Sequence, residues 1–527
     1  MTIDKANSPD KKINKWTVMF YLAGDNALSP LFVSQLKAMK DAGYHEDVEV
    51  LVYFDPNEVD SPTRIYNVNT VRKAKAPAGE KTKIGDDTTS FVRNMEEDEV
   101  RIPARATGAA GNLGKAMRKN NGDSTPAHEA LDLFLQYCVA EHRAEHYLLF
   151  LVGHGMIVGN DAFLPDEFPK SAITLKKLGV LLNRFSRRTN GGFELLAMHS
   201  CSMSGVEVVY EVQGTAKYMI ASEGLSFVAG WPYRQLLKKL FNALENDEEL
   251  ENLIESLYWE SFFNAKDFVL SGYPLELALV SLESSKLKGL TAAMKELVRE
   301  LRASLKNDVK RDLIQLSHLK AQSYFDENYT DLYDFCFCLS EHCKKGAALK
   351  SLKESCAAVM RTLEPITPTE RHEARKRFEA LIVHSSYLGW TFQYSHGLCI
   401  YFPWSEPVRK SSRRIINEYR EYAFATQLKL DSWAFFLMDY WKETMRSSRG
   451  EEDPRWGNGT RLNGGSTSGS PSGSLPDDGT PPDSKPTGGF SKPTGGSGQD
   501  CNCASIKNYP RNPRGAVPRP ARLSRKT

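Results

Sequence analysis

The chain has 527 residues, with 68 Lys and Arg against 66 Asp and Glu, a formal net charge of +2 and a hydrophobic fraction of 41%. This composition is globular, and it excludes fibrous and wholly disordered classes of protein. The length allows two to four domains, or one large α/β unit with additions, and it is ample for a sizeable core.

The last part of the chain has a different composition. Residues 450–527 contain 14 Gly and 11 Pro, with 11 Lys and Arg against 7 Asp and Glu. Such a segment cannot bury enough apolar surface to offset the entropy of ordering, so we expect residues 447–527 to be a disordered tail with a basic end. The remaining body carries no basic excess, which argues against nucleic-acid binding by the body and leaves the role of the tail open.

Neither terminus nor interior predicts membrane insertion. No stretch approaches the roughly 18 apolar residues of a membrane span, and residues 1–15 form a charged extension without the apolar region of a secretory signal. The nine cysteines are irregularly spaced and odd in number, which favours free thiols. We therefore expect a cytoplasmic protein without a membrane partner.

A βαβ unit opens the body. Trp16–Ala23 is an apolar run typical of a buried strand, and Ser29 followed by Pro30 is typical of a helix start. Apolar residues then recur at helical spacing before a second strand at Asp47–Phe54.

The same alternation continues to residue 283. Residues 80–125 are polar and predict a loop or insertion. The pattern then predicts helices at Pro126–Ala140, near Thr174–Phe185 and near Ser204–Gln213, and strands at His146–Gly153, Phe193–Met198 and Ala216–Ala221. Alternating strands and helices favour a largely parallel sheet covered by helices, which we assign to residues 16–283.

The second half is richer in helix. Strands are expected at Leu275–Leu282 and Gly397–Phe402, and helices over 284–306, 331–344, 346–363 and 431–445. We expect residues 284–446 to complete the first core or to pack on it.

Two reactive side chains follow strands of this sheet. His154 ends the run EHYLLFLVGHG, and Cys201 ends FELLAMHSC. Ligands and catalytic groups gather at the carboxyl ends of parallel strands, and a neighbouring imidazole can take the proton of a thiol that attacks an amide. The N–H groups of Gly155 and Cys201 could form an oxyanion hole, and a helix starting near Ser204 would favour the thiolate.

Other readings of these residues remain open. Free cysteine is among the most buried residue types, so Cys201 could simply belong to the core. Cys336, Cys338, His342 and Cys343 suggest zinc, but residues 336 and 338 would point about 200° apart on a helix. Core packing is favoured there, and we predict neither a metal site nor a cofactor. Phosphate-binding loop, serine-hydrolase and zinc-protease motifs are absent.

A series of segments resembles one family more specifically. The first motif is His154 with the glycine that follows it. The second is an apolar strand that ends in Cys201, followed by Met203, Gly205, Glu207, Val208, Tyr210 and Glu211. Ala221–Glu223 (ASE) and Gly230–Tyr233 (GWPY) come next, and WTVMFYLAGDNAL, YTDLYDF (Tyr329–Phe335) and HGLCIYFP (His396–Pro403) are further similar segments. Together they resemble the clostripain family of cysteine peptidases.

The resemblance implies a fold and a chemistry. It implies a caspase-like three-layer α/β/α sandwich in which His154 is the general base and Cys201 the nucleophile of an endopeptidase acting through a thioester on protein or peptide substrates. Family members are often cut between the two catalytic segments, and some depend on calcium. The basic segment Arg184–Asn190 is a candidate for cutting, although a solvated helix end is the favoured interpretation.

One position departs from the family pattern. The family has Asp two residues before the nucleophile, where it helps to attract a basic P1 side chain, and here that residue is His199. Alternate residues of a strand share a face, so we expect His199 beside the nucleophile, with Glu223 close by in the substrate site. The hypothesis that follows is a basic P1 preference that is weakened or lost, with neutral or acidic P1 side chains accepted. The alternative function is a catalytically weak caspase-like scaffold.

Overall fold

The computed structural model describes residues 13–57, 62–69, 98–118, 125–158, 163–227, 230–264, 275–325, 327–344, 347–364, 374–407 and 415–448. The chain divides into a unit of residues 1–457 and a second unit of residues 458–527. The second unit lies outside the described residues. So do most of the predicted tail and most of the predicted N-terminal extension. The structure that follows is that of the first unit.

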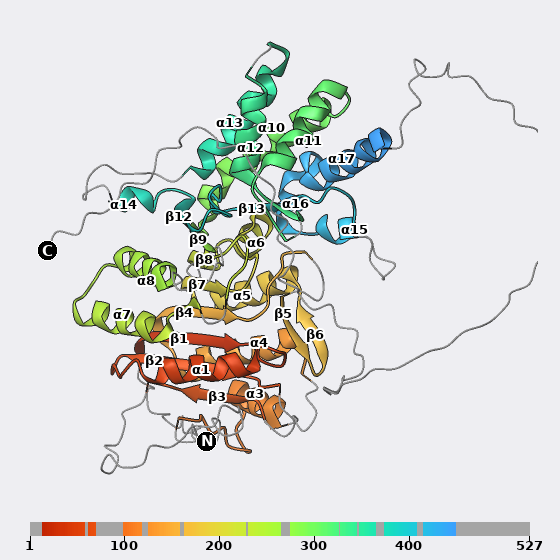
Figure 1. Ribbon diagram of the computed structural model, residues 1–527. Coiled ribbons are helices and arrows are strands. Elements are labelled where there is room, and N and C mark those ends of the chain that lie inside the picture. Colours follow the sequence, from red (N-terminus) through yellow and green to blue (C-terminus); the bar gives the residue numbers. More distant parts are fainter. Residues whose placement is uncertain are drawn as a thin grey trace, which may run out of the picture. The chain divides into compact units, whose positions relative to one another are not determined.

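An eight-stranded sheet forms the centre of this unit (Figure 1). Its order is β12-β9-β8-β7-β4-β1-β2-β3. The neighbouring pairs β2–β1, β1–β4, β4–β7 and β7–β8 are parallel, and β3, β9 and β12 join by antiparallel pairing. The strands are β1 (Asn14–Leu22), β2 (Val48–Phe54), β3 (Arg64–Asn67), β4 (Ala144–Val152), β7 (Phe193–His199), β8 (Ala216–Ala221), β9 (Leu275–Ser281) and β12 (Ile382–Leu388).

Both faces of the sheet are buried, which explains why its strands have nearly continuous apolar sequences. In β1, Val18 and Phe20 belong to one apolar core, whereas Met19 and Tyr21 belong to the other. The first core includes residues of α1 (Ser29–Lys40), α7 (Tyr233–Glu245) and α8 (Leu250–Asn264), and the second includes residues of α4 (Ala127–Glu141), α5 (Leu175–Thr189) and α6 (Val206–Val212). The architecture is the three-layer α/β/α sandwich that the resemblance implies.

The second half of the chain adds helices, one strand of the main sheet and a small sheet. Its helices are α10 (Ser284–Ser304), α11 (Asp308–Lys320), α12 (Leu332–His342), η2 (Ala347–Leu349), α13 (Lys350–Leu363), α14 (Ala374–Arg377), α15 (Ile415–Tyr419), α16 (Ala423–Leu428), η4 (Lys429–Asp431) and α17 (Trp433–Ser448). The small sheet has the order β10-β11-β13, from Ser323–Tyr324, Tyr329–Asp331 and Cys399–Tyr401.

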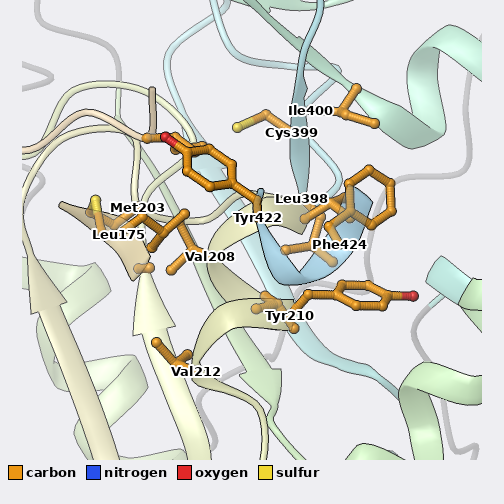
Figure 2. Close-up of a cluster of buried hydrophobic side chains, with 14 of the residues drawn as sticks. Leu175, Met203, Val208, Tyr210, Val212, Leu398, Cys399, Ile400, Tyr422 and Phe424 are labelled. Carbon is orange, nitrogen blue, oxygen red and sulfur yellow. The ribbon is translucent and has the colours of Figure 1, made fainter. Parts of the chain in front are cut away.

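An apolar cluster joins the two halves around α6 (Figure 2). Val208 and Tyr210 of α6 lie in it with Ile400 of β13 and Phe424 of α16. The aromatic run that begins α17 lies in the same core, since Trp433, Phe436 and Tyr440 are all fully buried. The run is therefore part of the core.

Several boundaries and elements differ from the expectations. The stretch predicted as loop over residues 80–125 contains α3 (Gly108–Arg118), an amphipathic helix rich in small residues. A hairpin of β5 (Phe163–Glu167) and β6 (Lys170–Ile173) was not predicted, and neither were β12, α7 or α8. Within the described residues, no helix has the length and apolar character needed to cross a bilayer.

Candidate active site

The strands that carry His154 and Cys201 are parallel neighbours in the centre of the sheet. Val152, the last residue of β4, pairs with His199, the last residue of β7. The adjacency continues beyond the strands, because the Gly153 N–H donates to the His199 carbonyl at 3.2 Å. His154 and Cys201 therefore leave the sheet at the same edge on adjacent segments.

Gly155 brings these two segments into backbone contact. A Cβ atom at Gly155 would lie 2.4 Å from the Cys201 carbonyl oxygen and 3.0 Å from the Cys201 nitrogen. No side chain fits at that distance, so the approach requires glycine. Within the part of the chain that the structure describes, the Gly155 N–H meets no hydrogen-bond acceptor.

The β5–β6 hairpin holds the backbone of His154. The Leu164 N–H donates to the His154 carbonyl at 2.9 Å. The turn after β1 fixes the hairpin in its place: the Asp25 carboxylate accepts from the Phe168 N–H at 2.6 Å, and the Asn26 amide donates to the Pro165 carbonyl at 3.0 Å. His154 is only partly buried, and the loss of water lowers the pKa of its imidazole below the ordinary value. The neutral form, which can accept a proton, therefore predominates at neutral pH.

The thiol of Cys201 contacts the backbone of Ser226. The Ser226 N–H points at Sγ at 3.4 Å, and the Ser226 carbonyl oxygen lies 3.6 Å from Sγ. Among the cysteines of the described residues, Cys201 is partly exposed whereas the other six are buried. An N–H directed at sulfur stabilises a thiolate, so Ser226 contributes to the electrostatics of the site.

A strained turn follows the thiol. Ser202 has φ +55°, a left-handed conformation that a non-glycine residue adopts only when its surroundings hold it there. The Ser202 N–H donates to the Gly224 carbonyl at 2.8 Å, and its hydroxyl donates to the Glu223 carbonyl at 3.0 Å. The segment after β8 thus fixes the turn that presents Cys201.

Residues of the second half complete this support. The Ser204 hydroxyl donates to the Gly397 carbonyl at 2.6 Å, and the Ser204 carbonyl accepts from the Cys399 N–H at 3.0 Å. Gly397 also donates its N–H to the Glu223 carboxyl at 2.9 Å. The turn that carries Cys201 is therefore held between segments that lie about 200 positions apart in the chain.

Three buried acidic side chains lie behind this turn. Glu223, Glu276 and Asp331 are at most 3% exposed. The Glu276 carboxyl accepts from the Gly224 N–H at 2.7 Å, and Asp331 accepts from the His396 N–H at 2.5 Å. Burial, together with the neighbouring carboxylates, raises the pKa of Glu223 well above its usual range. Burial raises the pKa of Glu276 to about 7.

Both shifts favour the protonated forms of Glu223 and Glu276, because adjacent carboxylates cannot all ionise without water.

His199 is the last residue of β7, and its side chain is buried. The strand ends at His199, so the rule that alternate residues share a face no longer holds at Cys201. The imidazole is 1% exposed, and it stacks on Trp231 with ring centroids 4.6 Å apart. Nε2 donates to the Phe227 carbonyl at 2.7 Å, and Nδ1 accepts from the Tyr233 hydroxyl. Burial lowers the pKa of His199 to about 3, so it is neutral.

Neither residue expected in the substrate site therefore faces solvent. The imidazole of His199 is fully engaged, and the Glu223 side chain is completely buried. His199 acts instead on the loop Gly224–Phe227, whose Ser226 touches the thiol. The GWPY motif supplies the Trp231 and Tyr233 that enclose His199, which accounts for the polar residue in this otherwise apolar layer.

Three smaller expectations can be compared with the structure. α6 starts at Val206 and has only seven residues, so its dipole gives the thiolate less support than the predicted helix near Ser204. Arg184–Thr189 belongs to α5, and Asn190 caps its C-terminus, which confirms the helix-end interpretation of the basic segment. Cys336, Cys338 and Cys343 are buried in and after α12. Over the described ranges no group of three or more His, Cys, Asp or Glu side chains could hold a metal ion.

A sequence model of the clostripain family matches residues 20–441. The match covers most of the chain, including His154 and Cys201. The chain belongs to the clostripain family and is a cysteine peptidase, a hydrolase acting on peptide bonds.

Solved structures with similar folds carry related names. An inactive zymogen C11 protease from Parabacteroides distasonis is 17% identical, with a TM-score of 0.48, over 79% of this chain and 99% of that chain. A secreted C11 cysteine protease from Bacteroides thetaiotaomicron, in complex with an irreversible peptide inhibitor, is 15% identical, with a TM-score of 0.48, over 80% of this chain and 99% of that chain. No curated protein matches the chain significantly. The family assignment rests on the match of residues 20–441.

Proposed function

We propose that Cys201 is the nucleophile and His154 the general base of a cysteine endopeptidase. The imidazole takes the proton of the thiol, and Sγ attacks the carbonyl carbon of the scissile bond. The C–N bond then breaks as the imidazolium returns the proton to the leaving amine, which leaves a thioester. Water, deprotonated by His154, hydrolyses the thioester and restores the thiol. The parallel course of residues 153–155 and 199–201 is the observation that carries this assignment.

The N–H groups of Gly155 and Cys201 are the proposed oxyanion hole. The negative charge of the tetrahedral intermediate develops on the substrate oxygen, and preorganised donors there contribute about 10²–10³-fold each in other enzymes. Two observations support Gly155: its backbone lies against that of Cys201, and its N–H meets no acceptor within the described residues.

We propose further that the enzyme lacks a strong preference for Arg or Lys at P1 and accepts neutral or acidic side chains. The family acid is replaced by a neutral, buried His199, and the nearby Glu223 is buried and protonated. A P1 library presented to the purified enzyme tests the specificity, and strong selective cleavage after Arg would contradict it.

Self-cleavage and cofactor use complete the proposal. We expect chain breaks made by Cys201 itself, and dyad chemistry that needs no cofactor. Mass spectrometry of the wild-type and Cys201→Ala proteins tests the first expectation. The second expectation is tested by labelling Cys201 with a peptidyl electrophile, once in calcium and once in a chelator.

A peptidyl electrophile tests the nucleophile directly. The wild-type protein should be labelled on Cys201, and Cys201→Ala should abolish labelling, peptide hydrolysis and self-cleavage together. Cys343→Ala, which removes a buried thiol, serves as the control and should be labelled like the wild type. Hydrolysis that persists in Cys201→Ala would exclude the proposed nucleophile, and a wild type that is neither labelled nor active would favour the scaffold alternative.

A further inference from the structure

The strand order brings a segment of the second half to the edge of the sheet that carries the catalytic residues. β9 is antiparallel to β8, and β12 is antiparallel to β9, so β12 runs in the same direction as β8, β7 and β4. Figure 1 shows β12, β9, β8 and β7 in this order. The turn that follows β12 therefore emerges at the same edge as His154 and Cys201.

The pairing places the end of β12 level with the nucleophile segment. Ala221 pairs with Ala278, and Tyr387 pairs with Glu276, two residues before Ala278. Extending this pairing by two residues places Glu223 opposite Glu276. Tyr387 and Glu223 therefore lie at the same level along the strand direction. The residues after Tyr387 rise beyond the sheet beside the loop that touches Cys201.

Side-chain contacts tie this turn to the loop Gly224–Phe227. A Cβ atom at Gly224 would lie 3.2 Å from the Phe392 ring and 3.0 Å from the Tyr324 ring. The Tyr324 hydroxyl hydrogen-bonds Ser395 at 2.6 Å, and Gly397 donates to Glu223. The turn and the loop thus form one packed unit next to the thiol.

Trp390 projects from this packed unit into solvent. Its side chain is 68% exposed, whereas Phe392, two residues later, is 8% exposed. Large aromatic side chains that stay exposed beside a site are typical anchors for a ligand, because they offer much apolar area at little cost in conformational entropy. The covered Phe392 fixes the turn, and the exposed Trp390 remains available.

We infer that Trp390 is a specificity-determining residue of this peptidase and binds an apolar side chain of the substrate. The inference rests on the proposed function of Cys201. Three strand spacings of about 4.8 Å separate β7 from β12, roughly 14 Å in all, and an extended peptide spans that distance in about four residues. Trp390 therefore contacts a substrate residue about four positions from the scissile bond.

A peptide library derived from a bacterial proteome, with cleavage products identified by mass spectrometry, tests this role. The wild-type enzyme should favour aliphatic or aromatic residues at one position remote from the scissile bond. Trp390→Ala should lose that preference and raise KM about tenfold for peptides that carry it, with kcat little changed. Trp390→Phe should retain part of the preference. Leu430→Ala, which removes another exposed apolar side chain on η4, is the matched control and should keep the wild-type profile.

The outcomes separate the inference from the proposed function. An active wild type with the same profile in Trp390→Ala would overturn the role of Trp390 and leave Cys201 in place. Cleavage that is equal in the wild type and Cys201→Ala would overturn both. Binding of a cleaved peptide's parent sequence to the inactive Cys201→Ala protein gives a second measurement, and affinity should fall when Trp390→Ala is added.

Discussion

The two sides of the proposed dyad are held in different ways. On the base side, a hairpin that begins nine residues after His154 donates a backbone N–H to the His154 carbonyl, and the turn after β1 anchors the hairpin. On the nucleophile side, the strained turn at Ser202 is fixed by the segment after β8 and by Gly397 and Cys399 from the second half.

The contrast teaches what each group requires. An imidazole that acts as a base needs only orientation and partial removal from water, both of which local segments supply. A thiol that must stand on a strained turn needs long-range support, because strain persists only where the surroundings hold it. The second half of the chain therefore belongs to the support of the proposed nucleophile.

Gly155, where the two sides meet, gives the largest expected effect. Gly155→Ala would force its Cβ against the Cys201 carbonyl oxygen and the Ser200 side chain, so the two segments must separate. Displacement of catalytic groups by about 1 Å can cost about 10²-fold in rate, so we expect at least this loss in peptide hydrolysis.

The matched control for this substitution is Gly191→Ala, because a Cβ there meets nothing within 4 Å. It should retain nearly wild-type turnover. Thermal unfolding of both variants distinguishes a damaged site from a damaged fold. A Gly155→Ala enzyme with wild-type activity would show that the close approach is not needed.

The sequence alone predicted most of the central sheet. Strands buried on both faces carry continuous apolar runs, and β8 was predicted at its observed bounds, Ala216–Ala221. β12 was not predicted because it is an edge strand, and its sequence, IVHSSYL, is half polar. The predicted cytoplasmic location stays a prediction.

The site was predictable only where it follows strand ends. His154 and Cys201 could be found because each ends an apolar run, and parallel strands share an edge. Ser226 could have been found from the same rule, since it follows β8. Glu276 and Asp331 come from later segments, and no local sequence pattern predicts their place beside the turn. The burial of His199 could not be predicted, because the residues that enclose it, Trp231 and Tyr233, come from a later segment.

The pH profile tests the base side. Burial lowers the pKa of His154 below its ordinary 6.5, and a general base must be neutral to act. The kcat/KM of peptide hydrolysis should therefore rise with pH through a midpoint below 6.5 and be maximal by neutral pH, with roughly a tenfold loss per pH unit below that midpoint.

His128→Gln, a change on α4, is the control for this profile and should leave the acid limb unmoved. An acid limb centred above pH 6.5 would contradict a desolvated His154 as the base.

The buried carboxyls test the nucleophile side, with the smallest expected effect. The folded-state pKa of Glu276, about 7, exceeds its unfolded value of 4.5, so the protonated form is favoured by folding. The stability that this proton contributes is fully present below pH 4.5 and is lost as the pH rises through 7. Glu276→Gln cannot ionise, so the variant should gain about 2 kcal/mol relative to the wild type between pH 5 and pH 8.

Chemical denaturation at several pH values measures this difference. Gln can still accept the Gly224 N–H, which keeps the loop beside Cys201 in place. Glu145→Gln, a change at an exposed position of β4, should parallel the wild type at every pH. Part of the pH dependence should survive in Glu276→Gln because Glu223 also holds a proton. If Glu276→Gln and the wild type lost stability equally between pH 5 and pH 8, Glu276 would not hold a proton in the folded state, and the support of the turn after Cys201 would have to come from its backbone contacts alone.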